Sequence, residues 1–218
     1  YDESAGVYDF MRKSDEIGEY IGLVERHFIE LGLIDKVRIV ADEPTDAELY
    51  MRRRAFVNRY APSFKYKAAV FDYKFIEASG DGISDYVPII TGISADPENM
   101  MRVKSMLNSR FLWYVCCAPD MPNTFIKSAA VEGYAIGWIT LLTGFDGFLR
   151  WSYTVWPEKP RESIKYKWSP GDTCFVYPAF DGSVLLSLRW KAMRKAAEIF
   201  TLAKAVEAAR NDAAEILD

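Results

Sequence analysis

The chain has 218 residues, of which half are hydrophobic and 15% aromatic, so it can bury a sizeable core as one domain over residues 1–218. Its formal net charge is −4 and it has no basic block, which argues against a nucleic-acid-binding protein. No apolar run reaches the roughly 18 residues that a membrane-spanning helix needs, so no membrane span is expected.

The first residue is Tyr1, and no charged segment followed by an apolar one precedes the first amphipathic pattern, so no signal peptide is visible. Because the chain does not begin with Met, we expect the intact protein to have an upstream segment. Apolar residues at helical spacing predict one or two helices over residues 6–33, with Gly32 as the stop.

Strand and helix patterns then alternate along the chain. We expect strands over residues 37–41, 67–72, 86–91, 111–117 and 148–153. We expect the remaining helices over residues 46–60, 96–108, 128–143 and from 184 to the end, where residues 196–218 form a helical tail. Thr45 precedes the helix that begins near residue 46, and Glu48 follows Thr45 by three residues, which is the spacing of a capping box.

This alternation indicates βαβ units and a parallel sheet. Five strands are fewer than the eight of a closed barrel, and the chain opens with a helix. We therefore predict an α/β fold that covers roughly strands four to eight of a (β/α)8 TIM-like barrel. A doubly wound open sheet is the alternative, although no glycine-rich nucleotide-binding motif follows any predicted strand.

The histidine and cysteine content argues against several kinds of site. His27, the single histidine, lies in an apolar helical stripe, so neither a Ser-His-Asp triad nor a histidine-rich metal site is expected. The adjacent Cys116 and Cys117 could form only a strained bridge, and with Cys174 they lack the C-x-x-C spacing typical of zinc sites. We expect no metal and no cofactor, and we assign acid–base chemistry to carboxylates or tyrosines.

Acids and aromatic rings gather where the predicted strands end. These residues are Asp42, Glu43, Asp72, Tyr73, Trp113, Tyr114, Trp151, Tyr153 and Trp156. Sugar rings pack their C–H faces on aromatic planes, and paired carboxyl groups cleave glycosidic bonds, so this combination is typical of a carbohydrate site. Among these residues we predict that Tyr114, Asp72, Trp151, Tyr153 and Trp156 bind substrate. Trp113 can equally be a core residue.

The adjacent acids Asp42 and Glu43 are the candidate catalytic residues. On a regular strand they would point to opposite faces, so they converge only if the strand bends or ends there, which Pro44 favours. Adjacent acids do not suit the usual separation of roughly 5–9.5 Å across the scissile bond. They suit a substrate-assisted route, in which the 2-acetamido oxygen of the sugar attacks the anomeric carbon. The alternative is that both acids only complement the N-terminus of the next helix.

Several segments resemble the C-terminal part of the catalytic barrel in glycoside hydrolase family 123. They are A-D-E-P at 41–44, W-Y-V-C-C-A-P at 113–119, G-F-D-G-F-L-R-W-S-Y at 144–153, G-D-T-C-F-V-Y-P at 171–178 and S-L-R-W-K-A-M-R at 187–194. The resemblance implies a retaining glycosidase for β-linked N-acetylhexosamine of the N-acetylgalactosamine type. It implies that Glu43 is the general acid/base, that Asp42 orients the acetamido group, and that Trp151 and Tyr153 shape the sugar pocket.

The resemblance also implies an extracellular or periplasmic location and a carbohydrate as the partner. A partial barrel would leave bare apolar edges at residues 37–41 and 148–151. We therefore expect that missing N-terminal barrel strands, or another chain, cover these edges. The alternative function is a non-catalytic carbohydrate-binding or structural module with the same barrel.

Overall fold

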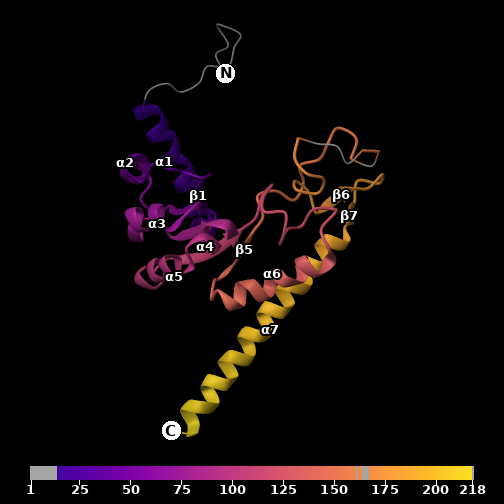
Figure 1. The fold of residues 1–218 in the computed structure, drawn as a ribbon. Helices are drawn as coiled ribbons and strands as arrows, with labels where there is room; N and C mark the ends of the chain where they lie inside the picture. Colours follow the sequence, from indigo (N-terminus) through magenta and orange to yellow (C-terminus); the bar gives the residue numbers. More distant parts are fainter. Residues whose placement is uncertain (1–13, 161, 164–166, 218) are drawn as a thin grey trace. The chain divides into compact units, whose positions relative to one another are not determined.

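The computed structural model describes residues 14–160, 162–163 and 167–217, with side chains up to residue 210 (Figure 1). The chain divides into two compact units. The first contains Tyr1–Tyr86 and Glu98–Ser109, and the second contains Val87–Pro97 and Arg110–Asp218. The expected single domain and its helical tail over residues 196–218 stay predictions.

The first unit contains most of the N-terminal helices. In chain order its elements are α1 (Ser14–Glu30), the 3-10 helix η1 (Ile34–Lys36), β1 (Arg38–Ala41), α2 (Ala47–Tyr60), β2 (Lys65–Val70), α3 (Tyr73–Ser79), the 3-10 helix η2 (Gly80–Gly82) and α5 (Pro97–Met106). Strand β3 (Asp85–Pro88) begins in this unit and ends in the second.

Helix α1 ends at Glu30, just before Gly32, the residue that the sequence predicts as its stop. Gly32 has a φ of 65°, a conformation that favours glycine. The N–H of Leu33 donates to the carbonyl of Phe28 at 2.9 Å, and the N–H of Gly32 donates to that of Ile29 at 2.9 Å. These two bonds satisfy carbonyls at the end of the helix, so the glycine closes it.

Strands β1 and β2 are parallel neighbours joined through α2. Arg38 lies opposite Lys65, and Ala41 lies opposite Ala68. Residues of β2 alternate between buried and partly exposed, with Tyr66, Ala68 and Val70 buried. This alternation is what a strand with one covered face requires.

Helix α2 begins one residue later than the predicted capping box requires. Its N-cap is Asp46, whose carboxylate accepts the N–H of Leu49 at 2.8 Å. The prediction that Thr45 and Glu48 form the box is therefore wrong. Asp46 is an equally strong N-cap type, and a carboxylate also complements the helix dipole.

The second unit contains the later strands and the long C-terminal helix. Besides the end of β3, its elements are α4 (Ile90–Ala95), β4 (Arg110–Tyr114), α6 (Ala130–Leu142), β5 (Gly147–Leu149), β6 (Val176–Pro178), β7 (Val184–Leu186) and α7 (Leu188–Leu217). Tyr114 lies opposite Leu149 in the parallel pair β4–β5. Ile89 forms a parallel bridge to Tyr114.

Four predicted boundaries in this region are wrong. The strand predicted over residues 111–117 ends at Tyr114. The strand predicted over residues 86–91 ends at Pro88, after which α4 begins at Ile90. The strand predicted over 148–153 is limited to β5. The final helix does not begin at Val184, because Val184–Leu186 pairs antiparallel with β6. The helix begins after Ser187, whose hydroxyl oxygen accepts the N–H of Trp190 at 3.1 Å.

The strands of the larger sheet follow the order β1-β2-β3-β4-β5. The strand order of a doubly wound sheet reverses at a switch point, whereas this order does not reverse. The chain therefore has an α/β fold with a mostly parallel five-stranded sheet. The closed TIM-like barrel, and the assignment of these strands to positions four to eight, stay predictions.

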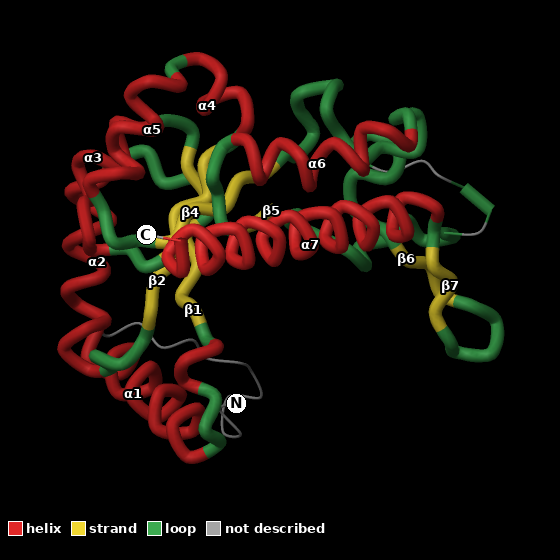
Figure 2. Tube along the Cα trace, turned by 90° about the horizontal axis from the view of Figure 1, so that it is seen from below, coloured by secondary structure: helices red, strands yellow, loops and turns green. Residues whose placement is uncertain are grey.

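Helices α6 and α7 lie side by side in the second unit (Figure 2). Gly133 and Gly137 of α6 face Ala192 and Ala196 of α7, and a Cβ on Gly133 would lie 2.8 Å from the Cβ of Ala192. Small residues at these positions let the two helix backbones approach closely. Val131 of the same helix is 65% exposed.

The core of the second unit is aromatic. Trp113 is completely buried, and its indole Nε1 donates to the hydroxyl of Thr140 at 2.8 Å. Phe111 packs against Phe145 with ring centroids 5.9 Å apart.

Within the part of the chain that the structure describes, no helix is long and apolar enough to cross a bilayer.

The close approach of α6 and α7 predicts an unusual response to alanine. On an open helix, Gly→Ala stabilises by up to about 1 kcal/mol. In Gly137→Ala the new methyl group would overlap the carbonyl oxygen of Ala196, so we expect the free energy of unfolding to fall by roughly 1–3 kcal/mol. Urea denaturation measures this change.

The matched control is Val131→Ala, at an exposed position of the same helix, which should change the free energy of unfolding by less than about 0.5 kcal/mol. A stabilised Gly137→Ala variant would show that the two helices are not in contact at this point.

Candidate active site

The candidate catalytic acids follow β1 at a sharp turn of the backbone. Glu43 has a φ of 50°, in the left-handed region that residues other than glycine rarely adopt. Both Asp42 and Glu43 line one pocket of about 480 Å³ in the first unit. The turn therefore ends the alternation of the strand and brings together two side chains that a regular strand would separate. Asp42 is exposed, and Glu43 is partly buried.

Helix α2 and strand β2 supply other walls of this pocket. Tyr50, Arg53 and Arg54 come from α2, and Tyr66 comes from β2. The guanidinium carbon of Arg54 lies 5.3 Å from the centroid of the Tyr66 ring. The Tyr66 hydroxyl donates to Asn58 Oδ1 at 2.6 Å, which fixes the ring. The pocket thus combines two acids, basic side chains and tyrosine rings.

Two buried donors in this pocket have no hydrogen-bond partner among the described residues: the Tyr50 hydroxyl and Arg54 Nε. Burial raises the pKa of Tyr50 to about 12; Tyr66 adds to the shift and Arg54 opposes it. A buried polar group without a partner costs about 1–3 kcal/mol. Both residues line the pocket, but the two atoms without partners have almost no exposed surface of their own.

Asp72, predicted to bind substrate, caps a helix. Its Oδ1 accepts the N–H of Lys74 at 2.9 Å and that of Phe75 at 3.4 Å at the start of α3. The carboxylate is exposed but already has these two donors. A role for Asp72 in substrate binding stays a prediction.

The predicted aromatic residues of the second unit differ in exposure. Trp151 is 46% exposed and Tyr153 is 38% exposed, whereas Tyr114 is only 3% exposed. Trp156 is partly exposed, and its Nε1 donates to the carbonyl of Val176 at 2.7 Å. Trp151 thus offers the most open ring, and Tyr114 lies in the core. Substrate binding by these four residues stays a prediction.

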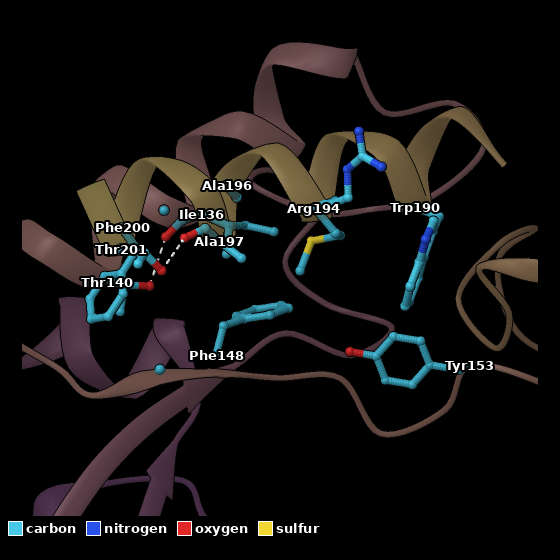
Figure 3. A pocket seen from close by; sticks show the side chains of 13 residues that line it. Ile136, Thr140, Phe148, Tyr153, Trp190, Arg194, Ala196, Ala197, Phe200 and Thr201 are labelled. Carbon is cyan, nitrogen blue, oxygen red and sulfur yellow. Dashed lines mark hydrogen bonds between the residues drawn. The ribbon is translucent and has the colours of Figure 1, made fainter. Parts of the chain in front are cut away.

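Tyr153 lines a second pocket, of about 430 Å³, beside α7 (Figure 3). Its ring packs against Trp190 at 5.9 Å and against Phe175 at 5.2 Å. Burial raises the pKa of Tyr153, and Arg150 opposes this shift. Phe148 and Met193 contribute further apolar surface. Of the described residues that line this pocket, Arg194 alone is charged.

Sequence reasoning did not find this second pocket. Trp190, Met193, Ala197 and Phe200 recur at helical spacing along α7, which is the one local signal for an apolar face. The partner residue Phe148 lies 42 positions before Trp190, so their meeting depends on the tertiary fold.

Sequence reasoning also missed a buried arginine that holds loops together. The Arg150 side chain is fully buried and forms an ion pair with the equally buried carboxylate of Asp172. Its guanidinium also donates to the carbonyls of Val115 at 2.7 Å and of Asp172 at 2.9 Å. Burial lowers the pKa of Arg150, and Asp172 opposes this shift. The chain segments after β4 and β5 are thereby tied to the segment before β6.

Among the residues that the structure describes, no three His, Cys, Asp or Glu side chains are grouped so that they could hold a metal ion.

A comparison with protein families identifies the family of this chain. Residues 2–205 match the family described as "Glycoside hydrolase 123, catalytic domain". This chain belongs to glycoside hydrolase family 123. The resemblance predicted from the five sequence segments is therefore confirmed.

A solved structure supports this family 123 assignment. Its title is "The details of glycolipid glycan hydrolysis by the structural analysis of a family 123 glycoside hydrolase from Clostridium perfringens". The two chains are 27% identical with a TM-score of 0.72, and the match covers 91% of this chain and 36% of that one. A comparison with curated proteins gave no match.

The buried hydroxyl group of Tyr50 predicts that this family 123 chain loses stability at alkaline pH. The pKa of Tyr50 in the folded chain, about 12, lies above its ordinary value of 10.0, so folding keeps the proton bound. The resulting contribution to stability is present below pH 10.0 and is lost between pH 10.0 and about 12. In Tyr50→Phe this part of the loss should disappear, as measured by urea denaturation at neutral pH and at about pH 11.

At neutral pH, Tyr50→Phe should be neutral or stabilising, because it removes a buried hydroxyl that lacks a partner among the described residues. Tyr134→Phe, at a surface position of α6, serves as the control and should leave the alkaline loss unchanged. A destabilised Tyr50→Phe variant would mean that the hydroxyl has a partner in solution.

Proposed function

We propose that this chain carries the catalytic acids of a glycosidase that hydrolyses β-linked N-acetylhexosamine by a substrate-assisted, retaining route. The observation that carries the proposal is the turn at Glu43, whose φ of 50° brings Asp42 and Glu43 to one pocket. Backbone strain of this kind persists where the surrounding structure holds it, and it is concentrated at functional sites. Membership of family 123 supports the same reaction class.

In the proposed first step, Asp42 accepts the acetamido N–H of the sugar and orients the amide. The amide oxygen then attacks the anomeric carbon, and Glu43 protonates the departing oxygen. Asp42 remains ionised and stabilises the positive charge on the oxazolinium ion. In the second step Glu43 removes a proton from water. This water attacks the anomeric carbon of the oxazolinium ion from the face that the leaving group occupied. Two inversions give overall retention.

Glu43 is partly buried and Asp42 is exposed. The exposed Arg53 of α2 lines the same pocket and would offer guanidinium donors to sugar oxygens.

The remaining substrate contacts are part of the same proposal. Trp151 and Tyr153 have the exposure that sugar stacking needs, and Trp156, Tyr114 and Asp72 complete the proposed set. The glycolipid glycan named for the Clostridium perfringens enzyme makes a glycan with a terminal N-acetylhexosamine a reasonable first substrate to test. An extracellular or periplasmic location, and further barrel strands covering the edges of β1 and β5, belong to this proposal.

One observation favours the alternative of a non-catalytic carbohydrate-binding module. The pocket beside α7 has aromatic walls from Phe148, Tyr153 and Trp190, and none of its described lining residues is an acid. Such a pocket could bind a sugar without cleaving it. In that case glycan binding would persist in the intact protein while hydrolysis of every β-hexosaminide would be absent.

The division of labour between the two acids gives a kinetic test on the intact protein. In Glu43→Gln, kcat/KM for a natural β-N-acetylhexosaminide should fall by roughly 10²–10⁴-fold, because the leaving oxygen is no longer protonated. An aryl N-acetyl-β-hexosaminide with a good leaving group needs little protonation, so its first step should be largely spared. Asp42→Asn should lose activity on both substrates, since ring closure itself is impaired.

Asp46→Asn is the matched control. It removes a carboxylate from the same pocket, yet asparagine is as good an N-cap for α2 as aspartate. This variant should stay within a few-fold of the unmodified protein on both substrates. If the leaving-group dependence appears in Asp42→Asn instead of Glu43→Gln, the assigned roles are reversed. If neither variant differs from Asp46→Asn, the two acids only complement the N-terminus of α2.

A further inference from the structure

Two adjacent thiols lie just beyond the end of β4. The sulfur atoms of Cys116 and Cys117 are 3.9 Å apart. Cys117 is exposed and Cys116 is partly exposed, whereas the third cysteine, Cys174, is buried. The chain thus carries a reachable pair of thiols and a covered one that serves as an internal reference.

The backbone around this pair is fixed by hydrogen bonds. The Cys116 carbonyl accepts Asn123 Nδ2 at 3.0 Å and Arg150 Nη1 at 3.3 Å. The Cys116 N–H donates to the carbonyl of Ala118 at 3.1 Å. Because these bonds hold the peptide in place, little conformational freedom is lost when the two sulfur atoms come together.

Exposure separates the pair from the third cysteine. The thiolate is the nucleophilic form in thiol–disulfide exchange, and access decides which thiol an oxidant can reach. Cys117 is exposed and its sulfur lies 3.9 Å from that of Cys116, whereas Cys174 is buried. Exposure and geometry therefore both favour reaction of the pair over reaction of Cys174.

We propose that Cys116 and Cys117 are a reversible oxidation site that closes into a vicinal disulfide by exchange with a low-molecular-weight disulfide. The exposed Cys117 thiolate attacks one sulfur of glutathione disulfide and releases one glutathione thiolate. The Cys116 thiolate then attacks Cys117 Sγ in this mixed disulfide and releases the second glutathione. The protein loses two protons and two electrons, and glutathione disulfide is reduced to two thiols.

Ring closure shortens the sulfur separation from 3.9 Å to about 2.05 Å. Adjacent Cα atoms are only about 3.8 Å apart, closer than the roughly 4.4–6.8 Å usual for a disulfide. A bridge between adjacent residues is strained, and strain makes a disulfide easier to reduce. Exposed and strained disulfides are the labile ones, so this site suits a reversible modification rather than a permanent crosslink.

Mass analysis of the complete chain after exposure to glutathione disulfide under native conditions tests the proposal. Trypsin cleaves after Arg110 and Lys127, so both thiols lie in one peptide, residues 111–127, and Cys174 lies in another. We expect the first peptide to become lighter by two hydrogen atoms, and dithiothreitol to reverse the change. Cys174 should stay a thiol, which also shows that the chain remained folded.

Two variants separate ring closure from ordinary glutathione adducts. In Cys116→Ser, Cys117 should stop at the mixed disulfide, because the attacking thiolate is missing. In Cys117→Ser, Cys116 should react several-fold more slowly, since it is less exposed. Unchanged thiols in residues 111–127, or two stable glutathione adducts there, would overturn the proposal. These readouts are masses and do not depend on glycosidase activity, so the outcome is independent of the function proposed above.

Discussion

The left-handed backbone at Glu43 is the constraint on which the candidate site depends. A regular strand would direct Asp42 and Glu43 to opposite faces. A φ of 50° at a residue other than glycine costs roughly 1–3 kcal/mol, which the rest of the fold must offset. Pro44 cannot donate to a sheet ladder, and Asp46 caps α2 two residues later. The strand end, the turn and the helix start therefore form one local unit that places both acids at a single pocket.

Local sequence signals predicted the elements that carry them. Gly32 adopts positive φ just after α1, where the sequence predicts a helix stop. The missed helices α3 and α4 have only seven and six residues, too few for a periodic pattern. The apolar run Val184–Leu186 fits a helix or a strand, and only its pairing with β6 decides. Predictions failed at short elements and where pairing with another segment made the choice.

The candidate site likewise has features that the sequence predicts and features that it does not. Two acids at a strand end followed by Pro44 can be recognised from the sequence, but the turn that makes them converge cannot. Arg150 directly follows β5 and reads as an exposed charge, yet it is buried because Asp172, 22 residues later, pairs with it. The pocket beside α7 likewise needs Phe148 and Trp190 to meet across 42 positions. Residue types were thus predictable, whereas burial and convergence depended on the tertiary fold.

Two arginine side chains of the second unit explain how its irregular loops can keep a fixed conformation without regular secondary structure. Backbone carbonyls that leave a sheet lose their ladder partners, and each costs about 1–3 kcal/mol if it is buried without a donor. Arg150 donates to the carbonyls of Val115, Cys116 and Asp172. Arg189 donates to those of Thr124 and Gly171 in the same way. A planar guanidinium with several fixed donors suits this task better than a lysine would. The thiols that follow β4 and the rings that follow β5 therefore lie on loops in which arginine side chains satisfy several backbone carbonyls, and this favours a fixed geometry outside a helix or strand.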